Sequence, residues 1–167
     1  MTYIKLTSAE GTTRNDMTWP IGKTNRATGK DRKLCSDGFL HVYDTPEQAA
    51  FMRPAHISVY TRAFEVESND KGITDGTKRG IKSCTVVREI TLPELTNEQR
   101  VEIAIRVSLL VYKEKSYARW AKDWLSGEDR TAHAAYAAAS VAAYAAYAAY
   151  ATGFIDLVSI INQVIKK

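Results

Sequence analysis

The sequence predicts an α+β protein, in which a small mixed β-containing N-terminal part precedes an all-helical C-terminal part with a long Ala/Tyr-rich helix. Two observations predict this class. Before Pro93, short runs of alternating apolar and polar residues lie between glycine-containing polar segments, as strands lie between loops. After Pro93, apolar residues recur at helical spacing, and residues 132–152 are almost all alanine or tyrosine. We therefore expect a mixed α/β part with two long loops at residues 1–93 and a helical hairpin assembly at residues 96–167.

The N-terminal part is expected to hold three to five strands and one short helix. Alternating apolar and polar residues predict strands at 3–7, at the end of 35–43, within 56–67 and at 83–92. The helix is expected from Asp44 to Met52. Proline near its first position and an acid in its first turn suit the free amides and the dipole at a helix start.

Two glycine-containing polar segments, 9–33 and 68–80, are predicted to be long irregular loops. The first of them carries a basic cluster. Gly22-Lys23-Thr24 is not a phosphate-binding loop, because the earlier glycine of that motif would fall at Met17. A solvated loop and contact with an acidic partner both remain open for the cluster. The residues predicted to bind a partner are Lys23, Arg26, Lys30, Arg32 and Lys33.

The C-terminal part reads as a series of helices. Thr96 and Gln99 fit a capping box, and the helix from Val101 to Tyr112 is apolar nearly all round except for a stripe with Glu102 and Arg106. The following helix places Trp120 and Trp124 on one face, where packing is their expected role. Ser126 is the expected N-cap of the alanine helix. Beyond Gly153 the apolar stripe is expected to continue in helical form to Lys167.

The run 132–152 is expected to be one helix of about 32 Å, because each residue adds about 1.5 Å. Its larger side chains fall three or four residues apart and form one stripe, and its alanines let a neighbouring helix approach closely. We expect a helix–helix contact, within the subunit or across a homo-oligomer. The residues predicted to make this contact are Tyr136, Tyr144, Tyr147, Ala142 and Ala146.

A membrane span is the alternative for this region, because residues 134–155 carry no charge and are long enough to cross a bilayer. Alanine is only marginally apolar, and four tyrosine hydroxyls and Ser140 would lie at hydrocarbon depth. We therefore expect a helix packed against protein and no membrane partner.

Net charge bears on whether the chain binds nucleic acid, and the cysteine content and the first residues bear on its cellular compartment. The chain has 167 residues and a formal net charge of +4, a mild basic excess that is weaker than nucleic-acid binding usually requires. A nucleic-acid partner is therefore left open rather than expected. Only Cys35 and Cys84 are present, and the first residues lack the apolar core of a signal peptide. A reducing cytoplasm is the expected setting.

No pattern predicts a metal site, a cofactor or a catalytic residue. The three histidines His41, His56 and His133 lie far apart, and no spacing typical of metal ligands occurs. Cys35 and His41 could form a nucleophile and base, but a turn and a strand between them do not fix their geometry. A free cysteine is the expected state, and no kinase, hydrolase or dinucleotide fingerprint appears.

Two motifs carry a resemblance. CSDGFLHVY at 35–43 and RWAKDWLSGEDR at 119–130, the latter followed by an alanine-rich tract, resemble a group of small uncharacterised proteins of tailed bacteriophages. The resemblance implies a phage accessory protein in the cytoplasm of an infected bacterium. Proteins of this size and origin commonly bind a host or host-defence component, and this analogy implies an inhibitor or a sequestering protein.

A second resemblance covers only the first half. The run GFLHVYDTPEQA at 38–49, a glycine-led strand followed by a helix, is similar to a segment of ADP-ribosyltransferase-like folds. That resemblance implies an Arg or His on an early strand and a Glu on a late strand. The strand 3–7 offers neither Arg nor His, although Glu65, Glu67 or Glu89 could supply the late carboxylate.

Two hypotheses for the function follow. In the first, the chain is a binding module for a host or defence protein, and its basic loop adds charge complementarity. In the second, the N-terminal part is an ADP-ribosyltransferase-like or nucleotide-binding enzyme. The enzyme needs a carboxylate and a basic partner that converge in one cleft, and the sequence does not place such a pair.

Overall fold

The computed structural model describes residues 1–53, 61–131 and 155–166. The chain divides into two compact units, Met1–Glu94 and Leu95–Lys167. Antiparallel strands occur in the first unit and helices in both, so the predicted α+β class is confirmed. The residues of the predicted alanine and tyrosine helix, with Tyr136, Tyr144, Tyr147, Ala142 and Ala146, lie outside the described residues.

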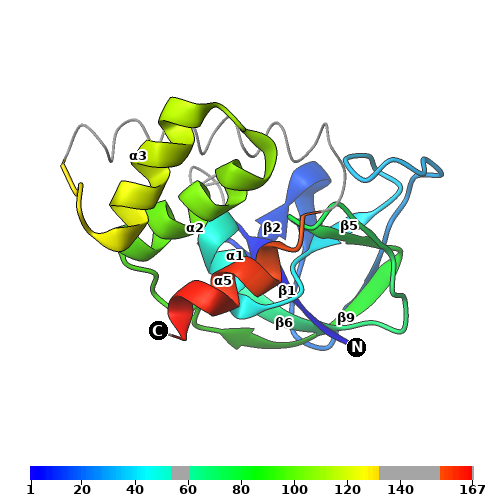
Figure 1. The fold of residues 1–167 in the computed structure, drawn as a ribbon. Coiled ribbons are helices and arrows are strands. Elements are labelled where there is room, and N and C mark those ends of the chain that lie inside the picture. Colours follow the sequence, from blue (N-terminus) through cyan, green and yellow to red (C-terminus); the bar gives the residue numbers. More distant parts are fainter. Residues whose placement is uncertain (54–60, 132–154, 167) are drawn as a thin grey trace. The chain divides into compact units, whose positions relative to one another are not determined.

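The first unit is built on two antiparallel sheets (Figure 1). One sheet has the order β1-β6-β9-β4, with strands at Thr2–Thr7, Arg62–Glu67, Ser83–Ile90 and Thr24–Arg26. The other has the order β5-β8-β7, with strands at Leu40–Val42, Arg79–Ile81 and Ile73–Thr74. The two sheets meet where Ile4 pairs with Tyr43. A separate hairpin joins β2 (Thr12–Thr13) and β3 (Met17–Thr18) through a short 3₁₀ turn, η1 (Arg14–Asp16).

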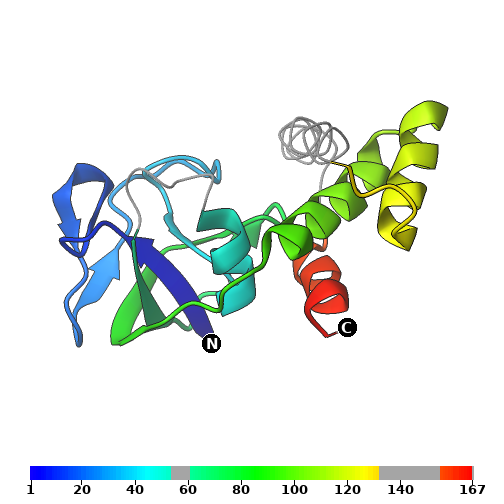
Figure 2. The same ribbon diagram turned by 90° about the vertical axis from the view of Figure 1, so that its left-hand side faces the viewer.

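Both faces of β1 are buried. Ile4 and Leu6 pack with Ala49 of helix α1 (Pro46–Met52), which is capped by Thr45 and covers this face of the sheet (Figure 2). Tyr3 belongs to the other core, between the two sheets, and Lys5 shares its face because side chains alternate along a strand. That core consists of Tyr3, Trp19, Leu40, Val42, Phe64, Val66, Ile81, Cys84 and Val86.

A buried polar network fastens the segment 70–80 to the start of α1. Gln48 is fully buried; its side chain accepts a hydrogen bond from the Asp44 amide at 2.7 Å and donates one to the Gly76 carbonyl at 3.0 Å. The carboxylate of Asp44 also holds Arg79 in a two-armed pair at 2.5 and 3.0 Å. Arg79 in turn lies over the ring of Tyr3 at 5.6 Å. The segment is therefore ordered by side chains rather than by a long strand.

The prediction that 9–33 and 68–80 are irregular loops is wrong in part. The first contains β2, η1, β3 and β4, and the second contains β7 and the start of β8. The expected three to five strands become nine within the described residues. These extra strands are two or three residues long, too short for alternation of apolar residues to appear in the sequence.

The second unit contains helices α2 (Asn97–Val111), α3 (Lys115–Ser126) and α5 (Leu157–Ile165) among its described residues. Helix α2 contacts both α3 and α5. The capping box of Thr96 and Gln99 is present, and Arg106 pairs with Glu102 at 2.7 Å, as predicted.

Packing in this unit confirms the expected role of the tryptophans. Trp124 is buried with Ile105 and Ala121, and Trp120 packs against the same cluster. Two predicted boundaries are wrong. Ser126 is not an N-cap, because it ends α3, where Gly127 takes the left-handed conformation at φ 89°. Helix α5 does not continue from Gly153, because it begins anew at Leu157, where the Asp156 side chain accepts from the Ser159 amide.

Replacing Gln48 by Met should lower the free energy of unfolding of the full chain by about 2 kcal/mol. The change keeps the side-chain volume and leaves the Asp44 amide and the Gly76 carbonyl without their partner in a buried place. Urea denaturation followed by circular dichroism measures the loss. Asn69→Met, on an exposed residue, is the control and should stay within about 0.5 kcal/mol of the parent. Equal stability of both variants would contradict the role given to Gln48.

Candidate functional site

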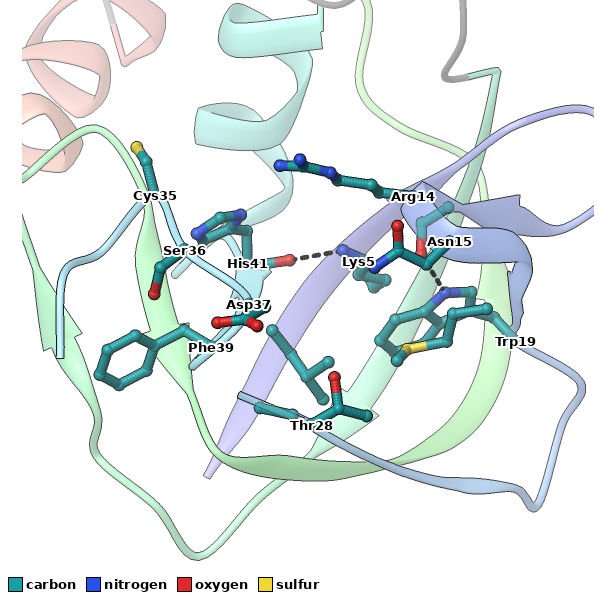
Figure 3. A pocket seen from close by; sticks show the side chains of 14 residues that line it. Lys5, Arg14, Asn15, Trp19, Thr28, Cys35, Ser36, Asp37, Phe39 and His41 are labelled. Carbon is teal, nitrogen blue, oxygen red and sulfur yellow. Dashed lines mark hydrogen bonds between the residues drawn. The ribbon is translucent and has the colours of Figure 1, made fainter. Parts of the chain in front are cut away.

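The first unit contains a cavity of about 450 Å³. Three segments wall it: β1, the β2–β3 hairpin with its turn, and the stretch 27–41. Figure 3 shows Lys5, Arg14, Asn15 and Trp19 on one side, with Cys35, Ser36 and Phe39 across from them. Most lining side chains are polar: Lys5, Thr13, Arg14, Asn15, Thr28, Ser36, Asp37 and His41.

Lys5 is the buried cation of this cavity, with 8% of its surface exposed. Its ammonium donates one hydrogen bond to the His41 carbonyl at 2.8 Å and lies 4.7 Å from the ring centre of Trp19. It takes part in no ion pair among the described residues. Burial lowers its pKa from the usual 10.5 to about 8, because a charged amine loses its hydration there.

Trp19 fixes the wall beside Lys5. Its ring is 1% exposed, and its indole N–H donates to the Thr13 hydroxyl at 2.9 Å. Cys84 belongs to the same core, and burial raises the pKa of its thiol to about 11, so the thiol is protonated at neutral pH. The cation of Lys5 therefore has a π face and a neutral thiol as neighbours, and neither supplies a full counter-charge.

The turn of the β2–β3 hairpin carries Arg14 and Asn15 to the rim. Asn15 and Asp16 both take positive φ, at 62° and 55°, which is uncommon for residues with side chains. Arg14 is exposed and forms no ion pair among the described residues. This turn thus brings a second cation to the cavity, and no described carboxylate neutralises it.

The stretch 27–41 closes on itself and holds Asp37 at the cavity. The Gly29 amide donates to the Asp37 carbonyl at 3.0 Å, and a Cβ on Gly29 would lie 1.9 Å from a carboxylate oxygen of Asp37. A Cβ on Gly38 would lie 1.9 Å from the Asp31 carbonyl. Gly38 is needed for this close approach because it meets backbone atoms, whereas Gly29 meets the side chain of Asp37. The carboxylate of Asp37 is exposed, and no described residue pairs with it.

His41 lies at the same cavity as Lys5 and Cys35. Its Nε2 is in contact with the Leu34 carbonyl, and its ring is half-buried. Burial is the main cause that lowers its pKa below 6.5, with a smaller contribution from the charge of Lys5, so the ring is mostly neutral at pH 7. The cavity therefore brings together the two residues that the sequence left as an unfixed pair, Cys35 and His41.

The five predicted partner-binding residues are all exposed and lie outside the cavity lining. Lys23 bonds to Thr18, and Arg26 lies on β4. The other three are Lys30, Arg32 and Lys33, which lie on the stretch 27–41 that also walls the cavity. None of the five is in an ion pair with a described residue.

A second depression, of about 530 Å³, lies between Trp19, Pro20, Ile21 and Phe64. Its cation is Arg62, which is neutralised by Glu89 at 2.7 Å. This depression is a weaker candidate for a ligand-binding site, because its lining holds no unpaired buried charge.

The described residues also hold no group of three or more His, Cys, Asp or Glu able to bind a metal.

Sequence reasoning missed Lys5, Trp19 and Asp37. One signal was available: Lys5 shares a face with Tyr3 and Thr7 on a strand whose opposite face carries Ile4 and Leu6. The pattern did not show that both faces of the strand are buried. The return of the stretch 27–41 onto β1 depends on glycine contacts across the loop, which no local pattern reveals.

These features define an α+β protein whose N-terminal unit carries a polar cavity of small-ligand size. Residues 1–98 match the family described as a domain of unknown function, DUF7666, and the chain belongs to that family. The matched region includes every residue that lines the cavity. No curated protein and no solved structure matches the chain. None of the helices in the described part of the chain has the length and apolar character needed to cross a membrane.

Replacing Lys5 by Met should remove a rise in the free energy of unfolding that the parent shows between pH 8 and 10.5. At pH 7 and below, Lys5 is mainly protonated in both the folded and the unfolded chain. Between pH 8 and 10.5 the unfolded chain binds more protons, so stability of the parent rises with pH relative to Lys5→Met. The rise should reach about 3 kcal/mol, because one pKa unit corresponds to about 1.4 kcal/mol.

Urea denaturation of both proteins at pH 7, 8, 9 and 10 measures this difference. Taking the difference between the two proteins removes groups that titrate alike in both. It does not remove Cys84 and His41, because the charge of Lys5 lowers the pKa of each in the parent. A difference that stays flat across the window would show that the amine of Lys5 is not buried as described.

Proposed function

We propose that the N-terminal unit is a binding module that takes the anionic group of a small polar ligand into the cavity beside Lys5. The observation that supports this proposal most directly is a buried ammonium that borders an open cavity and has no carboxylate partner among the described residues. A buried charge is costly unless a counter-charge and hydrogen bonds compensate it. A bound phosphate or carboxylate would supply both.

The other lining residues indicate the rest of the ligand. Arg14 adds a second cation, and an arginine fork suits the paired oxygens of a phosphate or carboxylate. Across the cavity, the free carboxylate of Asp37 can only accept hydrogen bonds, so it favours a ligand with hydroxyl or amino groups. The ligand we propose is therefore a hydroxylated or amino-bearing anion, such as a sugar phosphate or a nucleotide.

The resemblance to tailed-phage proteins gives the proposed setting. An accessory protein that holds a small anion of the infected bacterium would act by sequestering it, which agrees with the type of function expected from that resemblance. The exposed basic residues Lys30, Arg32 and Lys33 lie on the stretch that walls the cavity. They would raise the local concentration of anions near its mouth, or contact an acidic host or defence protein.

The geometry favours binding over the transferase alternative. Two of the three candidate carboxylates are occupied: Glu89 pairs with Arg62 at 2.7 Å, and Glu65 pairs with Arg88 at 2.6 Å. The third, Glu67, is exposed and does not line the cavity. No glutamate is among the residues that line the cavity. The carboxylate present there is Asp37, on a loop rather than on a late strand. The early strand offers Lys5 where the resemblance implies Arg or His.

Replacing Lys5 by Gln should weaken the binding of an anionic ligand about tenfold or more, because a charge-assisted hydrogen bond in a buried place is lost. Calorimetric titration at low salt with inorganic phosphate, ribose 5-phosphate and adenosine monophosphate tests this. Lys71→Gln, an exposed lysine away from the cavity, is the matched control and should bind like the parent. Failure of the parent to bind any of the three, or equal binding by Lys5→Gln, would overturn the proposal.

Replacing Lys30, Arg32 and Lys33 together by Gln should slow the capture of an anionic ligand and leave its release nearly unchanged. Exposed charges outside the cavity act mainly through long-range attraction, which salt screens. Stopped-flow association rates at two salt concentrations measure the effect. The control replaces Lys113, Lys115 and Lys122 of the second unit, which are equally exposed. Identical slowing by both triple variants would assign the effect to net charge and not to the basic stretch.

A further inference from the structure

We propose that Lys5 captures an anionic aldehyde covalently, as an imine formed between its amine and the carbonyl carbon of the ligand. The inference rests on the proposed function for the cavity and its preference for anions, and it adds a reaction to them. Lys5 is the one lysine among the described residues that is buried, and it lines the cavity.

The surroundings of Nζ leave the amine free to react. Among the described residues, Nζ donates one hydrogen bond, to the carbonyl oxygen of His41 at 2.8 Å. Once the ammonium gives up a proton, the neutral amine can keep this bond as a donor while its lone pair faces away from the acceptor. No described carboxylate lies in an ion pair with Lys5 to hold the proton on it. A buried lysine without an acidic partner is the arrangement that activates an amine as a nucleophile.

The populated protonation state agrees with this geometry. Since burial places the pKa of Lys5 at about 8, about a tenth of the molecules carry the neutral amine at pH 7. An exposed lysine with a pKa near 10.4 has well under a hundredth of its amine neutral at that pH. The advantage of Lys5 over exposed lysines in nucleophile concentration is therefore more than about tenfold.

The reaction needs no oxidant, reductant or co-reactant. The lone pair of the amine forms a C–N bond with the carbonyl carbon, and the carbonyl electron pair moves to oxygen, which takes up a proton. The neutral amine carries two hydrogens, and both leave with the carbonyl oxygen as one molecule of water. A C=N bond between Nζ and the former carbonyl carbon remains. Hydrolysis by water reverses each step. The product is a reversible covalent complex of protein and ligand.

Two lining residues suit the proton transfers and the ligand's charge. His41 is mostly neutral at pH 7 and lines the same cavity, so its imidazole can accept and return a proton. Arg14 forms no ion pair with a described residue and lies on the same side of the cavity as Lys5 in Figure 3, so it can hold the anionic group. Trp19 shields one side of Nζ, at 4.7 Å from its ring centre, which limits access of water to the imine from that side.

Borohydride trapping with pyridoxal 5′-phosphate tests the proposal, because this probe carries both an aldehyde and a phosphate. Borohydride delivers hydride to the imine carbon and converts the imine to a stable secondary amine. After brief exposure of the full chain to one equivalent of probe, peptide mass spectrometry should find the adduct on Lys5 at about ten times the level on any exposed lysine. The labelling rate should rise with pH up to about 8 and then level off.

Lys5→Arg is the decisive variant, because it keeps a cation for anion binding and cannot form an imine. It should retain phosphate binding by calorimetry and lose the adduct, whereas Lys71→Arg should label like the parent. Labelling spread evenly over exposed lysines, or an undiminished adduct in Lys5→Arg, would overturn the imine. If the parent binds phosphate through Lys5 and yet gives no adduct, the imine is wrong and the binding module stands. If neither phosphate binding nor an adduct occurs, both proposals fail.

Discussion

The arrangement of the N-terminal unit depends on a lysine buried on a strand with two covered faces. On β1, Ile4 and Leu6 face α1, so Tyr3 and Lys5 must face the core between the sheets. No rotation of the strand could expose Lys5 without exposing the apolar pair. The charge is tolerated because the ammonium donates a hydrogen bond to the His41 carbonyl and makes a cation–π contact with the Trp19 ring. The cavity beside it is also open to ligands. Packing of the strand thus fixes the position of the amine of Lys5.

The opposite wall of the cavity contains two glycines that lie in close contact with other residues of the stretch 27–41. Gly29 lies against the carboxylate of Asp37, and Gly38 lies against the backbone of Asp31, in each case where a Cβ would collide. The network of Gln48, Asp44 and Arg79 then ties the segment 70–80, which leads into β8, to the start of α1. Since β8 pairs with β5, this network also supports the strand that carries His41. Positions of the polar groups around Lys5 therefore follow from contacts far apart in the sequence.

The sequence allowed the class and the longer elements to be predicted, because they rest on local patterns. The capping box at Thr96 and Gln99 and the pair of Glu102 and Arg106 are set by neighbours within a few residues. The packing of Trp124 was predictable because Trp120 and Trp124 fall on one face of a helix. The short strands β2, β3, β4, β7 and β8 were missed, because each is defined by its pairing partner rather than by its own residues. Lys5 was missed for a related reason. Its burial depends on Trp19 and on the stretch 27–41, and the alternating residues of β1 do not predict that these segments cover it.

The same amine cannot serve both proposed roles in one complex. An anion placed directly against Nζ stabilises the ammonium and raises its pKa, which removes the neutral amine that an imine requires. Covalent capture therefore needs the anionic group at some distance from Nζ, where Arg14 can hold it, and the carbonyl at Nζ. A ligand whose anion and carbonyl are adjacent would place its charge against Lys5 and bind without reaction. A ligand with several bonds between the two groups would let Arg14 and Lys5 act separately. The cavity of about 450 Å³ has room for the longer ligand, so the spacing of the two groups decides which ligands react.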